Sequence, residues 1–428
     1  MDISRIHQIF LESNGICTDT RKIESNTIFF ALKGENFNGN TYASQALELG
    51  AAYSIIDEAV YKTSEKHILV KNVIQTLQEL ATYHREYLKV PIIALTGSNG
   101  KTTTKELINN VLSTKFRTTA TIGNLNNHIG VPITLLSMTK KTEIGIVEMG
   151  ANHQREIDFL CSIARPDYGY ITNIGKAHLE GFGGIEGVLK GKTELYRHLK
   201  QNNKLAFINA EDPKLVKAAK DLKIYSFSQG DENDVKIKFL DTNPNVVVSY
   251  QNQIIESNLI GAYNFTNIAA AIAIGNYFKI DADYIKQAIE SYIPLNNRSQ
   301  IIEKDNCTIL LDAYNANPTS MEAAIKNFDI LKNLDHKIAF LGDMFELGDE
   351  AKAEHQKIAD FIVSTAVHEI HLIGSNFYST ENNDPRIKKY KSFDDLKDNW
   401  SLALKNKESI LLIKGSRGMK LERILDLL

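Results

Sequence analysis

The sequence predicts an α/β protein built from three domains, because of its length and the alternation of its hydrophobic segments. The chain has 428 residues, of which 43% are hydrophobic, and this length exceeds what one hydrophobic core usually organises. From about residue 89 onward, β-type runs alternate with helical runs, a pattern typical of parallel sheets covered by helices. We therefore expect a small α/β module over residues 1–88, a central parallel-sheet domain over 89–297 and a third α/β domain over 298–428.

The N-terminal module is expected to contain short elements, with a β-type run over Thr27–Leu32 and a helical run over Tyr42–Ala52. Four polar residues precede that strand: Thr18, Asp19, Thr20 and Arg21. Two hydroxyls, a carboxylate and a guanidinium could together hold a phosphate or a sugar. Short polar side chains in a turn more often hydrogen-bond the backbone, and on the sequence alone we favour that interpretation.

The central domain opens on a strand, a glycine turn and a helix start. The apolar run Ile92–Leu95 predicts a buried strand, which breaks at Gly97 and Gly100 before a helical pattern begins around Thr103. Backbone N–H groups in such a turn point inward, and the helix dipole adds partial positive charge. Phosphate oxygens can therefore bind there.

The residues that follow the turn have the chemistry of a nucleoside triphosphate site. Lys101 supplies a cation for the terminal phosphates, and the hydroxyl of Thr102 suits a magnesium ion. The general phosphate-loop pattern has a further glycine where this chain has Leu95, so the loop is a variant. We predict a P-loop ATPase domain.

Two later strands of this domain are followed by candidate metal ligands. Glu148 follows the apolar run Ile144–Val147, and His178 lies after a second β-type run. In parallel sheets, ligands collect at the carboxyl ends of the strands. Mg²⁺ prefers oxygen ligands, so Glu148 is the natural ligand, and a structural role remains an equal alternative for His178.

Two further polar clusters are weaker candidates for a ligand site. The segment Asn124–His128 is rich in amides, which could bind a ligand without adding charge, although an ordinary turn is the simpler interpretation on spacing alone. Lys190 and Lys192 fall at the start of a predicted helix, where lysines are usually solvated.

The third domain repeats the alternation of strands and helices. We expect strands over residues 308–311, 337–341, 370–373 and 410–413, helices over 319–331 and 351–363, and a last helix at the C-terminus. This pattern predicts a Rossmann-like open sheet. No glycine-rich fingerprint follows its first clear strand, where the chain reads Asp312–Pro318, so we expect no NAD site.

Composition narrows the class of protein. The formal charge is -3, from 49 basic and 52 acidic residues, which argues against nucleic-acid or membrane-surface binding driven by bulk charge. The three cysteines are far apart and suit buried thiols in a reducing cytosol. The N-terminus lacks an apolar signal core, and the longest apolar tract, near Ile268–Ile274, is too short to span a bilayer. We expect a cytoplasmic protein without membrane insertion.

Taken together, these motifs resemble the Mur ligase family nearly end to end. The most specific segments are Thr96–Thr102, Gly123–Gly130, Glu148–His153, Ala177–Gly183, Asp312–Pro318 and Gly342–Gly348. A leucine at position 95 is normal in that family. The segment Asn38–Tyr42 departs from the family pattern, so the resemblance assigns no uracil contact to Asn38 or Asn40.

The resemblance implies where ATP binds. The phosphates would be held by a loop whose members are Gly97, Ser98, Asn99, Gly100, Lys101, Thr102 and Thr103. Asn264 and Asn267 would contact adenine, while Arg298 and Asp312 would close on the nucleotide from the third domain.

The resemblance also implies two Mg²⁺ ions, and a catalytic set of Lys101, Glu148, His178 and Lys192. Thr102 and Glu148 would bind one ion, and His178 would help bind the second together with Lys192, which related ligases carbamylate. Carbamylation would turn that ammonium into an anionic oxygen ligand. The substrate-binding residues would be Thr18, Asp19, Thr20 and Arg21 at its UDP end and Asn126 and Asn127 at its muramoyl part.

The implied activity is ATP-dependent peptide ligation through an acyl phosphate. The implied substrates are UDP-N-acetylmuramoyl-tripeptide and D-alanyl-D-alanine, with the dipeptide bound by the third domain of a monomer. Acyl phosphates hydrolyse in water, so we expect the apo protein to be open and to close before chemistry. The alternatives are a sibling ligase that adds diaminopimelate or lysine, a folylpolyglutamate synthase, a nucleotide-dependent switch protein and, last, an oxidoreductase.

Overall fold

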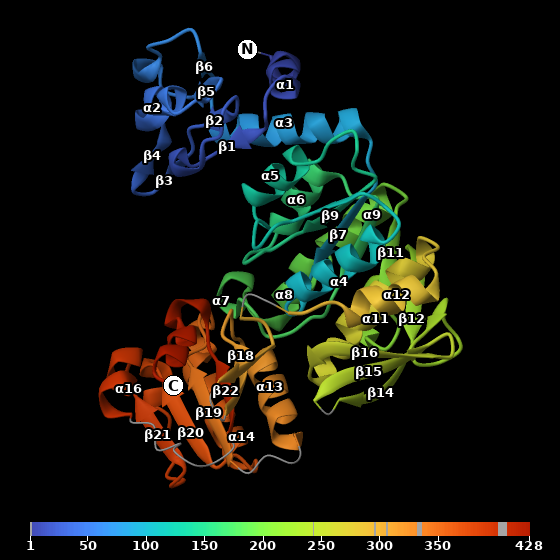
Figure 1. Ribbon diagram of the computed structural model, residues 1–428, viewed down its shortest axis with the longest axis vertical. Helices are drawn as coiled ribbons and strands as arrows, with labels where there is room; N and C mark the ends of the chain where they lie inside the picture. The colour runs from blue at the N-terminus through green and yellow to red at the C-terminus, as the bar shows by residue number, and fades with distance from the viewer. Residues whose placement is uncertain (1, 243, 295–296, 305–306, 332–335, 401–408) are drawn as a thin grey trace.

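The computed structural model describes residues 2–428 apart from 243, 295–296, 305–306, 332–335 and 401–408. Figure 1 shows an N-terminal unit at the top, a central unit on the right and a C-terminal unit at the lower left, each organised around a parallel or mainly parallel sheet. This is the three-part α/β architecture that the sequence predicts.

The N-terminal unit is a four-stranded parallel sheet with the order β1-β2-β5-β6. The strands are β1 (Ile16–Cys17), β2 (Ile28–Phe30), β5 (Tyr53–Ile56) and β6 (His67–Leu69), with a hairpin of β3 (Lys33–Gly34) and β4 (Phe37–Asn38). The helices are α1 (Ile3–Leu11), α2 (Ala43–Glu48) and α3 (Val73–Leu88), with 3₁₀ turns η1 (Thr20–Lys22), η2 (Gly39–Tyr42) and η3 (Ala59–Tyr61). The predicted strand and helix are both present, in shortened form.

Helix α3 joins the N-terminal unit to the central unit. The side chain of Asn72 accepts a hydrogen bond from the backbone N–H of Gln75 and so caps its first turn. Lys89 ends it in a left-handed conformation. Between these ends, residues at helical spacing such as Val73, Leu77 and Leu80 are buried, which gives α3 an apolar face against its neighbours.

The central unit is a seven-stranded parallel sheet with the order β13-β12-β11-β10-β7-β9-β8. The strands are β7 (Ile92–Thr96), β8 (Thr118–Ala120), β9 (Ile144–Glu148), β10 (Tyr168–Ile171), β11 (Leu205–Asn209), β12 (Lys223–Ser228) and β13 (Val235–Lys236). The helices are α4 (Lys101–Ser113), α5 (Gly130–Leu136), α6 (Glu156–Ala164), α7 (Leu179–Phe182), α8 (Ile185–Lys192), α9 (Glu194–Gln201), α10 (Pro213–Ala218), α11 (Phe265–Tyr277) and α12 (Ala282–Glu290), with η4 (Ala262–Asn264). All five residues of β7 are buried, as expected for a strand covered on both faces.

The central unit also contains a feature that the sequence analysis missed. Strands β14 (Lys238–Thr242), β15 (Asn245–Tyr250) and β16 (Gln253–Ile260) form a separate antiparallel sheet. Buried and partly buried residues alternate along β15, which is the signature of a sheet with one face on the core.

The C-terminal unit is a six-stranded sheet with the order β17-β18-β22-β19-β20-β21, in which only β17 is antiparallel. The strands are β17 (Gln300–Lys304), β18 (Cys307–Asp312), β19 (His336–Gly342), β20 (Glu369–Ile373), β21 (Ile387–Tyr390) and β22 (Ser409–Lys414). The helices are α13 (Pro318–Ile330), α14 (Ala351–Val363), α15 (Ser375–Tyr378) and α16 (Phe393–Asn399), with turns η5 (Gly348–Glu350), η6 (Arg417–Met419) and η7 (Leu421–Asp426). The predicted last helix is wrong, because that segment forms two short 3₁₀ turns.

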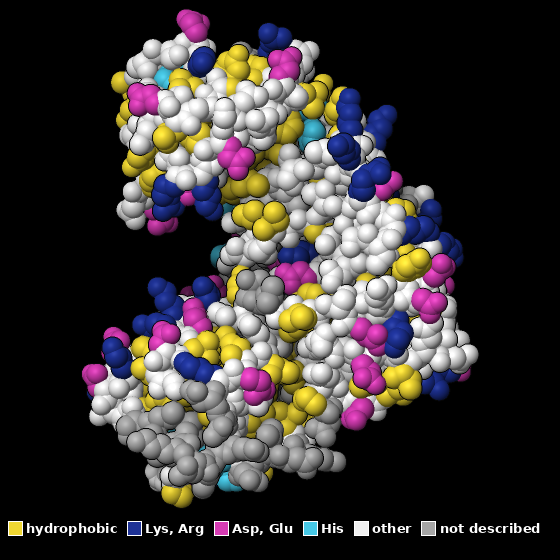
Figure 2. Space-filling view, in the orientation of Figure 1, with side chains coloured by type: hydrophobic (Ala, Val, Ile, Leu, Met, Phe, Trp, Pro, Cys, Tyr) yellow, Lys and Arg dark blue, Asp and Glu magenta, His cyan; other side chains and the backbone are white. Residues whose placement is uncertain are grey.

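The order of the strands determines where a ligand can bind. Although β22 is last in sequence, it lies between β18 and β19, so Asp312 and Lys414 end neighbouring parallel strands. Such a reversal of strand order opens a crevice at the carboxyl ends. Figure 2 shows a deep hollow between the upper and lower units. The residues that line the main cavity come from both the central and the C-terminal units.

All three cysteines are buried, as predicted. Among the described residues, no helix is both long enough and apolar enough to cross a membrane.

Candidate active site

The main cavity has a volume of about 850 Å³, and six residues of the phosphate loop, Ser98, Asn99, Gly100, Lys101, Thr102 and Thr103, line one end of it. Strand β7 ends at Thr96 and α4 begins at Lys101, two residues earlier than the sequence pattern predicts. Gly97 has φ +143° and Gly100 has φ +79°, both outside the range of ordinary L residues. A Cβ at Gly97 would also lie 2.0 Å from Oγ1 of Thr172, so this turn requires glycine for space as well as for conformation.

The side chain of Lys101 folds back over this loop. Its Nζ donates hydrogen bonds to the carbonyl oxygens of Gly97 at 2.9 Å and Ser98 at 3.2 Å. Burial lowers the pKa of Lys101, and the negative charge of Glu148 opposes that shift. The ammonium is therefore held at the loop, with a carboxylate close by.

The segment after β10 fixes the shape of the phosphate loop, a role that the sequence analysis did not predict. Oγ of Ser98 donates to the carbonyl of Gly175 at 3.0 Å and accepts from its N–H at 2.9 Å. The N–H of Asn99 donates to Oδ1 of Asn173 at 3.0 Å, and Oγ1 of Thr172 donates to the carbonyl of Asn99 at 2.6 Å. The loop is thus braced by a neighbouring strand end.

Glu148 is 1% exposed and lies between a hydroxyl and an amide. Oγ1 of Thr102 donates to its Oε2 at 2.9 Å, and Nδ2 of Asn126 donates to its Oε1 at 2.7 Å. Asn127 instead accepts from the N–H groups of Ile129 and Gly130, at the start of α5. Of the two predicted amides, only Asn126 touches the acidic group, although both line the cavity.

Thr102 and Glu148 are the kind of oxygen donors that suit Mg²⁺. Within the described ranges, no group of three or more His, Cys, Asp and Glu residues is arranged to hold a metal ion. Mg²⁺ is commonly bound by one or two carboxylates together with substrate phosphates, so this donor set fits an ion that arrives with a nucleotide.

The structure corrects the predicted position of Lys192 in its helix. The sequence analysis placed it at the start of a helix, where lysines are usually solvated, but it is the last residue of α8 and is 1% exposed. Its Nζ donates to the carbonyl of Ala151 at 2.9 Å and lies 5.0 Å from the ring centre of Phe182. Burial, helped by the charge of Lys101, holds the pKa of Lys192 well below its ordinary value.

His178 lines the cavity next to the C-terminal unit. Its side chain is 19% exposed, and Nδ1 lies in contact with the carboxylate of Glu346. This contact lowers the pKa of Glu346. The sequence analysis left a structural role open for His178, and the structure gives that residue a partner from another unit.

The two predicted adenine contacts are buried and hydrogen-bonded to each other. Nδ2 of Asn267 donates to Oδ1 of Asn264 at 2.8 Å, and Oγ1 of Thr104 donates to Oδ1 of Asn267 at 3.0 Å. Nδ2 of Asn264 donates to the carbonyl of Ile260 at 2.7 Å. These amides fasten α11 to α4, and both line the cavity.

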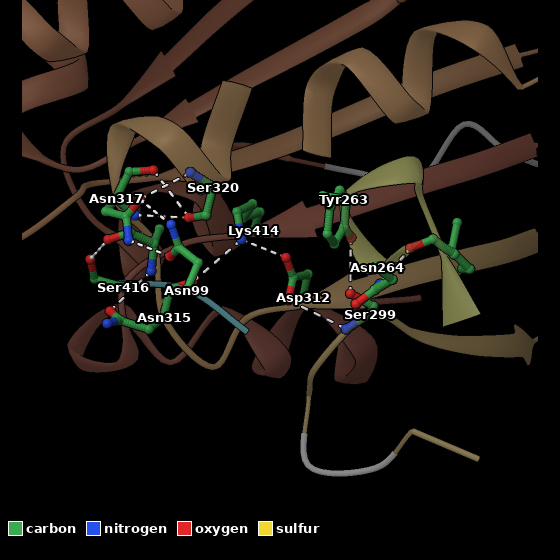
Figure 3. Close-up of polar contacts among 12 residues, drawn as sticks. Asn99, Tyr263, Asn264, Ser299, Asp312, Asn315, Asn317, Ser320, Lys414 and Ser416 are labelled. Carbon is green, nitrogen blue, oxygen red and sulfur yellow. Dashed lines mark hydrogen bonds and ion pairs between the residues drawn. The ribbon is translucent and has the colours of Figure 1, made fainter. Parts of the chain in front are cut away.

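Arg298 and Asp312 reach the cavity from the start of the C-terminal unit. The guanidinium of Arg298 lies 3.5 Å from the ring centre of Tyr314. Oδ2 of Asp312 pairs with Nζ of Lys414 at 2.5 Å, and its Oδ1 accepts from the N–H of Ser299 at 3.3 Å. Figure 3 shows Lys414 between Asp312 and the loop that carries Asn315.

Several residues that line this end of the cavity were missed by the sequence analysis. They are mostly polar and include Asn173, Tyr263, Asn315, Asn317, Thr319, Ser320 and Lys414. Lys414 is 1% exposed, and its position directly after the apolar run of β22 was the available signal. Asn317 caps α13 by accepting from the N–H of Ser320, and its Nδ2 donates to Oδ1 of Asn99 at 2.6 Å across the cavity.

The predicted substrate residues of the N-terminal unit do not line this cavity. Asp19 accepts from the N–H of Arg21 at 3.0 Å and forms an ion pair with its guanidinium at 2.7 Å. Hydrogen bonds from Arg21 lower the pKa of Asp19 to about 2. The Arg21 side chain is 86% exposed, so it can reach a ligand, while Thr18 and Thr20 are partly buried.

Asn38 and Asn40, to which the resemblance assigned no uracil contact, serve the N-terminal unit itself. Oδ1 of Asn38 accepts from the N–H of Asn40 at 3.0 Å. Asn40 is 0% exposed, and its Nδ2 donates to Oδ1 of Asp57 at 2.9 Å.

Three family models match the chain in succession. They are described as the Mur ligase family catalytic domain, over residues 12–93, the Mur ligase middle domain, over 95–275, and the Mur ligase glutamate ligase domain, over 297–417. Among curated proteins, a UDP-N-acetylmuramoyl-tripeptide–D-alanyl-D-alanine ligase from Bacillus subtilis is 36% identical and matches 96% of this chain and 92% of that protein.

Solved structures also match the chain over nearly its whole length. The crystal structure of MurF from Acinetobacter baumannii matches with a TM-score of 0.86 and 30% identity, over 98% of each chain. MurF ligase from Thermotoga maritima, solved in complex with ADP, matches with a TM-score of 0.82 and 25% identity, over 98% of this chain and 97% of that one.

Proposed function

The chain belongs to the Mur ligase family, and from this premise we propose that it is an ATP-dependent ligase that joins D-alanyl-D-alanine to UDP-N-acetylmuramoyl-tripeptide. The product would be the UDP-muramoyl-pentapeptide precursor of peptidoglycan. The observation that carries the proposal is one cavity in which a phosphate loop, a lysine and a buried glutamate face polar residues of a second unit. We propose a cytoplasmic monomer with small-molecule substrates.

The geometry of the phosphate loop supports nucleotide binding there. The turn over Gly97–Gly100 can hold phosphate oxygens on backbone N–H groups, and Lys101 adds a cation at the same place. ADP is bound by the MurF ligase of Thermotoga maritima, whose chain matches this one over nearly its whole length. We propose ATP as the nucleotide here, with Asn264 and Asn267 at the adenine and Arg298 and Asp312 on the phosphates and ribose.

Thr102 and Glu148 would hold one Mg²⁺ ion, which would neutralise phosphate charge when bound. His178 and Lys192 would hold a second. Lys192 fits carbamylation, because only an unprotonated amine reacts with carbon dioxide and burial favours that form. The new N–C bond releases one proton and leaves an anionic oxygen donor in place of an amine.

The first chemical step brings two anions together. A carboxylate oxygen of the tripeptide attacks the terminal phosphorus of ATP, and the bond from that phosphorus to the bridging oxygen breaks. ADP departs, and the phosphorylated carboxylate is an acyl phosphate. Two unit charges about 4 Å apart interact by roughly 4 kcal/mol at an effective dielectric constant near 20. Lys101 offsets this repulsion and fixes the terminal phosphates for an in-line transfer.

In the second step the amine of D-alanyl-D-alanine attacks the acyl carbon. The tetrahedral intermediate expels phosphate, and the nitrogen loses its proton as the peptide bond forms. We propose that the polar face of the C-terminal unit binds this dipeptide, because its residues line the cavity opposite the phosphate loop. The acyl phosphate must be protected from water, so the C-terminal unit has to be docked during both steps.

The test is an assay with ATP, Mg²⁺ and UDP-N-acetylmuramoyl-tripeptide, offered a panel of amines, with the product identified by its mass. We expect Lys101→Ala to lower turnover by about 100- to 1000-fold, as for loss of an electrostatic stabiliser, without loss of the fold. Lys190→Ala is the matched control, since Lys190 is an exposed lysine of α8. ADP formation that needs neither the tripeptide nor an amine would support a nucleotide switch and refute the ligase.

A further inference from the structure

The segment between β10 and α8 contacts two different parts of the protein. On one side it braces the phosphate loop through Asn173 and Gly175. On the other side, the N–H of Lys176 donates to Oγ1 of Thr319 at 3.0 Å, at the start of α13 in the C-terminal unit. Figure 1 shows α7, within this segment, directly against the C-terminal unit. The segment thus links the phosphate end of the cavity to the C-terminal unit.

The centre of this contact is the pairing of Nδ1 of His178 with the carboxylate of Glu346. Both residues have left-handed backbones, with φ 53° at His178 and 61° at Glu346, although neither is glycine. Left-handed backbones at non-glycine residues cost energy and occur where the surroundings or a function require them. Here two such residues face each other from separate units. The N–H of Glu180 also donates to the carbonyl of Glu346 at 3.4 Å.

The turn that presents Glu346 is fastened from several directions. The N–H of Met344 donates to Nε2 of the buried His355 at 2.9 Å, and that of Phe345 donates to Oγ of Ser416 at 2.9 Å. The buried carboxylate of Asp343 accepts from the N–H of Phe377 at 2.9 Å. The backbone of Glu346 is therefore held in place by its own unit, without help from its side chain.

The carboxylate of Glu346 has little to do within the C-terminal unit. Its side chain is 52% exposed, and the ionic partner that the structure gives it is His178. Its position next to one ring nitrogen matches a general feature of metal-binding histidines, which usually give their second nitrogen to a carboxylate or carbonyl. That partner fixes the tautomer and the ring orientation.

We propose that Glu346 is a positioning residue for His178, supplied by the C-terminal unit, so that the second metal site is complete only when this unit is docked. Nδ1 of His178 would carry the proton toward Glu346, which leaves Nε2 as the nitrogen for the ion. The proposal rests on the proposed function, because His178 is given a metal-binding role there. It goes further by making metal binding depend on a residue from another unit.

The test uses Glu346→Gln and Glu346→Ala, with Asp349→Asn as the matched control. Asp349 is an exposed acid three residues further on, so its substitution changes the net charge by the same amount as Glu346→Gln. The probe is Mn²⁺, titrated against the full-length protein with ADP and followed by electron paramagnetic resonance. We expect the weaker of the two ion sites to lose affinity by about 10- to 100-fold in both Glu346 variants and not in the control.

Two further measurements exclude a merely structural effect. In ¹⁵N-histidine spectra the Nδ1–H tautomer of His178 should be lost in Glu346→Ala, which removes the acceptor, while the melting temperature stays unchanged. In a His178→Ala background, Glu346→Ala should have no additional effect on Mn²⁺ affinity, because the two residues act through one contact.

Unchanged Mn²⁺ affinity together with an unchanged His178 tautomer in Glu346→Ala would overturn this proposal, and an additive effect in the double variant would do the same. Failure of the ligase proposal has a different signature, since the wild-type protein would then form no ADP, or would form ADP without needing the tripeptide and an amine, whatever the Glu346 variants do to Mn²⁺ affinity. The two failures are therefore distinguishable.

Discussion

The two junctions between the units are built differently. The N-terminal junction is formed by the whole 16-residue helix α3, whose buried face packs against α5 and α6. The C-terminal junction instead uses short segments, α7 and η5, and polar side chains such as Lys176 and Glu346 that are half exposed. A continuous hydrophobic cluster includes residues of all three units. The two junctions therefore differ in their other contacts, which are a long apolar helix face at the N-terminal junction and polar side chains at the C-terminal junction.

This difference indicates which unit can move. Separating α3 from the central unit would expose several large side chains, each worth about 1.5–3 kcal/mol when fully buried. Partly exposed ion pairs are worth about 0–1 kcal/mol, because water replaces them easily. We therefore expect the C-terminal unit to leave and redock at a lower cost than the N-terminal unit, although the hydrophobic cluster also reaches it. The predicted opening of the apo protein would then be a motion of the C-terminal unit.

The largest expected effect is at the N-terminal junction. Leu80 is 0% exposed and belongs to the cluster that α3 shares with α5 and α6. We expect Leu80→Ala to lower the free energy of unfolding by about 2–5 kcal/mol, because it removes buried methyl groups and leaves a cavity. Urea unfolding measures this. The control Glu79→Ala, on the exposed face of α3, should change it by less than about 0.5 kcal/mol.

If Leu80→Ala lowered the free energy of unfolding as little as Glu79→Ala does, α3 would not form an apolar junction. Turnover per folded molecule at low temperature should be unchanged in Leu80→Ala, since this side chain does not line the cavity.

The next effect is a dependence of stability on pH at the same junction. Nε2 of His84 lies 2.9 Å from the carbonyl of Met138 and must donate to it, so Nδ1 of His84 accepts from Nε2 of His7 at 3.0 Å. Both rings are then neutral. Burial, together with His84, lowers the pKa of His7 to about 4, and burial also lowers the pKa of His84.

Because the unfolded chain binds protons on these residues at a higher pH than the folded chain, stability is complete above about pH 6.5 and falls as the pH drops toward 4. For His7, which is 3% exposed, the loss between pH 7 and pH 5 should be roughly 2 kcal/mol. Urea unfolding at the two pH values checks this against His7→Phe, whose pH dependence should be smaller. Equal slopes for both proteins would exclude His7 as the source.

Much of the site could be predicted from local sequence. The apolar strand, two glycines and a lysine specify the phosphate loop, and Glu148 directly follows a buried strand. Lys192 could not be placed in this way, because residues i and i+2 of a helix point to different sides and only the packing of α8 shows which lysine is buried.

The remaining site residues depend on contacts between distant parts of the chain. Lys414 meets Asp312 only because β22 is inserted between β18 and β19, and strand order is not encoded in a local pattern. Glu346 meets His178 only when two units dock. The antiparallel sheet of β14, β15 and β16 was missed for a different reason, since the alternation of its strands was read as part of the larger parallel pattern.

The smallest effect on stability tests the C-terminal junction most directly. Glu354 of α14 is 3% exposed, and its Oε1 pairs with two lysines at nearly the same distance. Lys176, at 2.7 Å, comes from the central unit, whereas Lys357, at 2.8 Å, comes from the same helix as Glu354. The two contacts are chemically alike and differ in whether they cross the junction.

We expect Lys176→Met and Lys357→Met each to change the free energy of unfolding by no more than about 1 kcal/mol, because one lysine remains beside Glu354 in either case. Only Lys176→Met should widen the distance between the central and C-terminal units. Spin labels on the exposed positions of Glu232→Cys and Asp394→Cys measure that distance, and the native cysteines are buried. If both variants widened it equally, or neither did, the polar contacts would not control docking, and the hydrophobic cluster would have to hold the C-terminal unit as firmly as it holds α3.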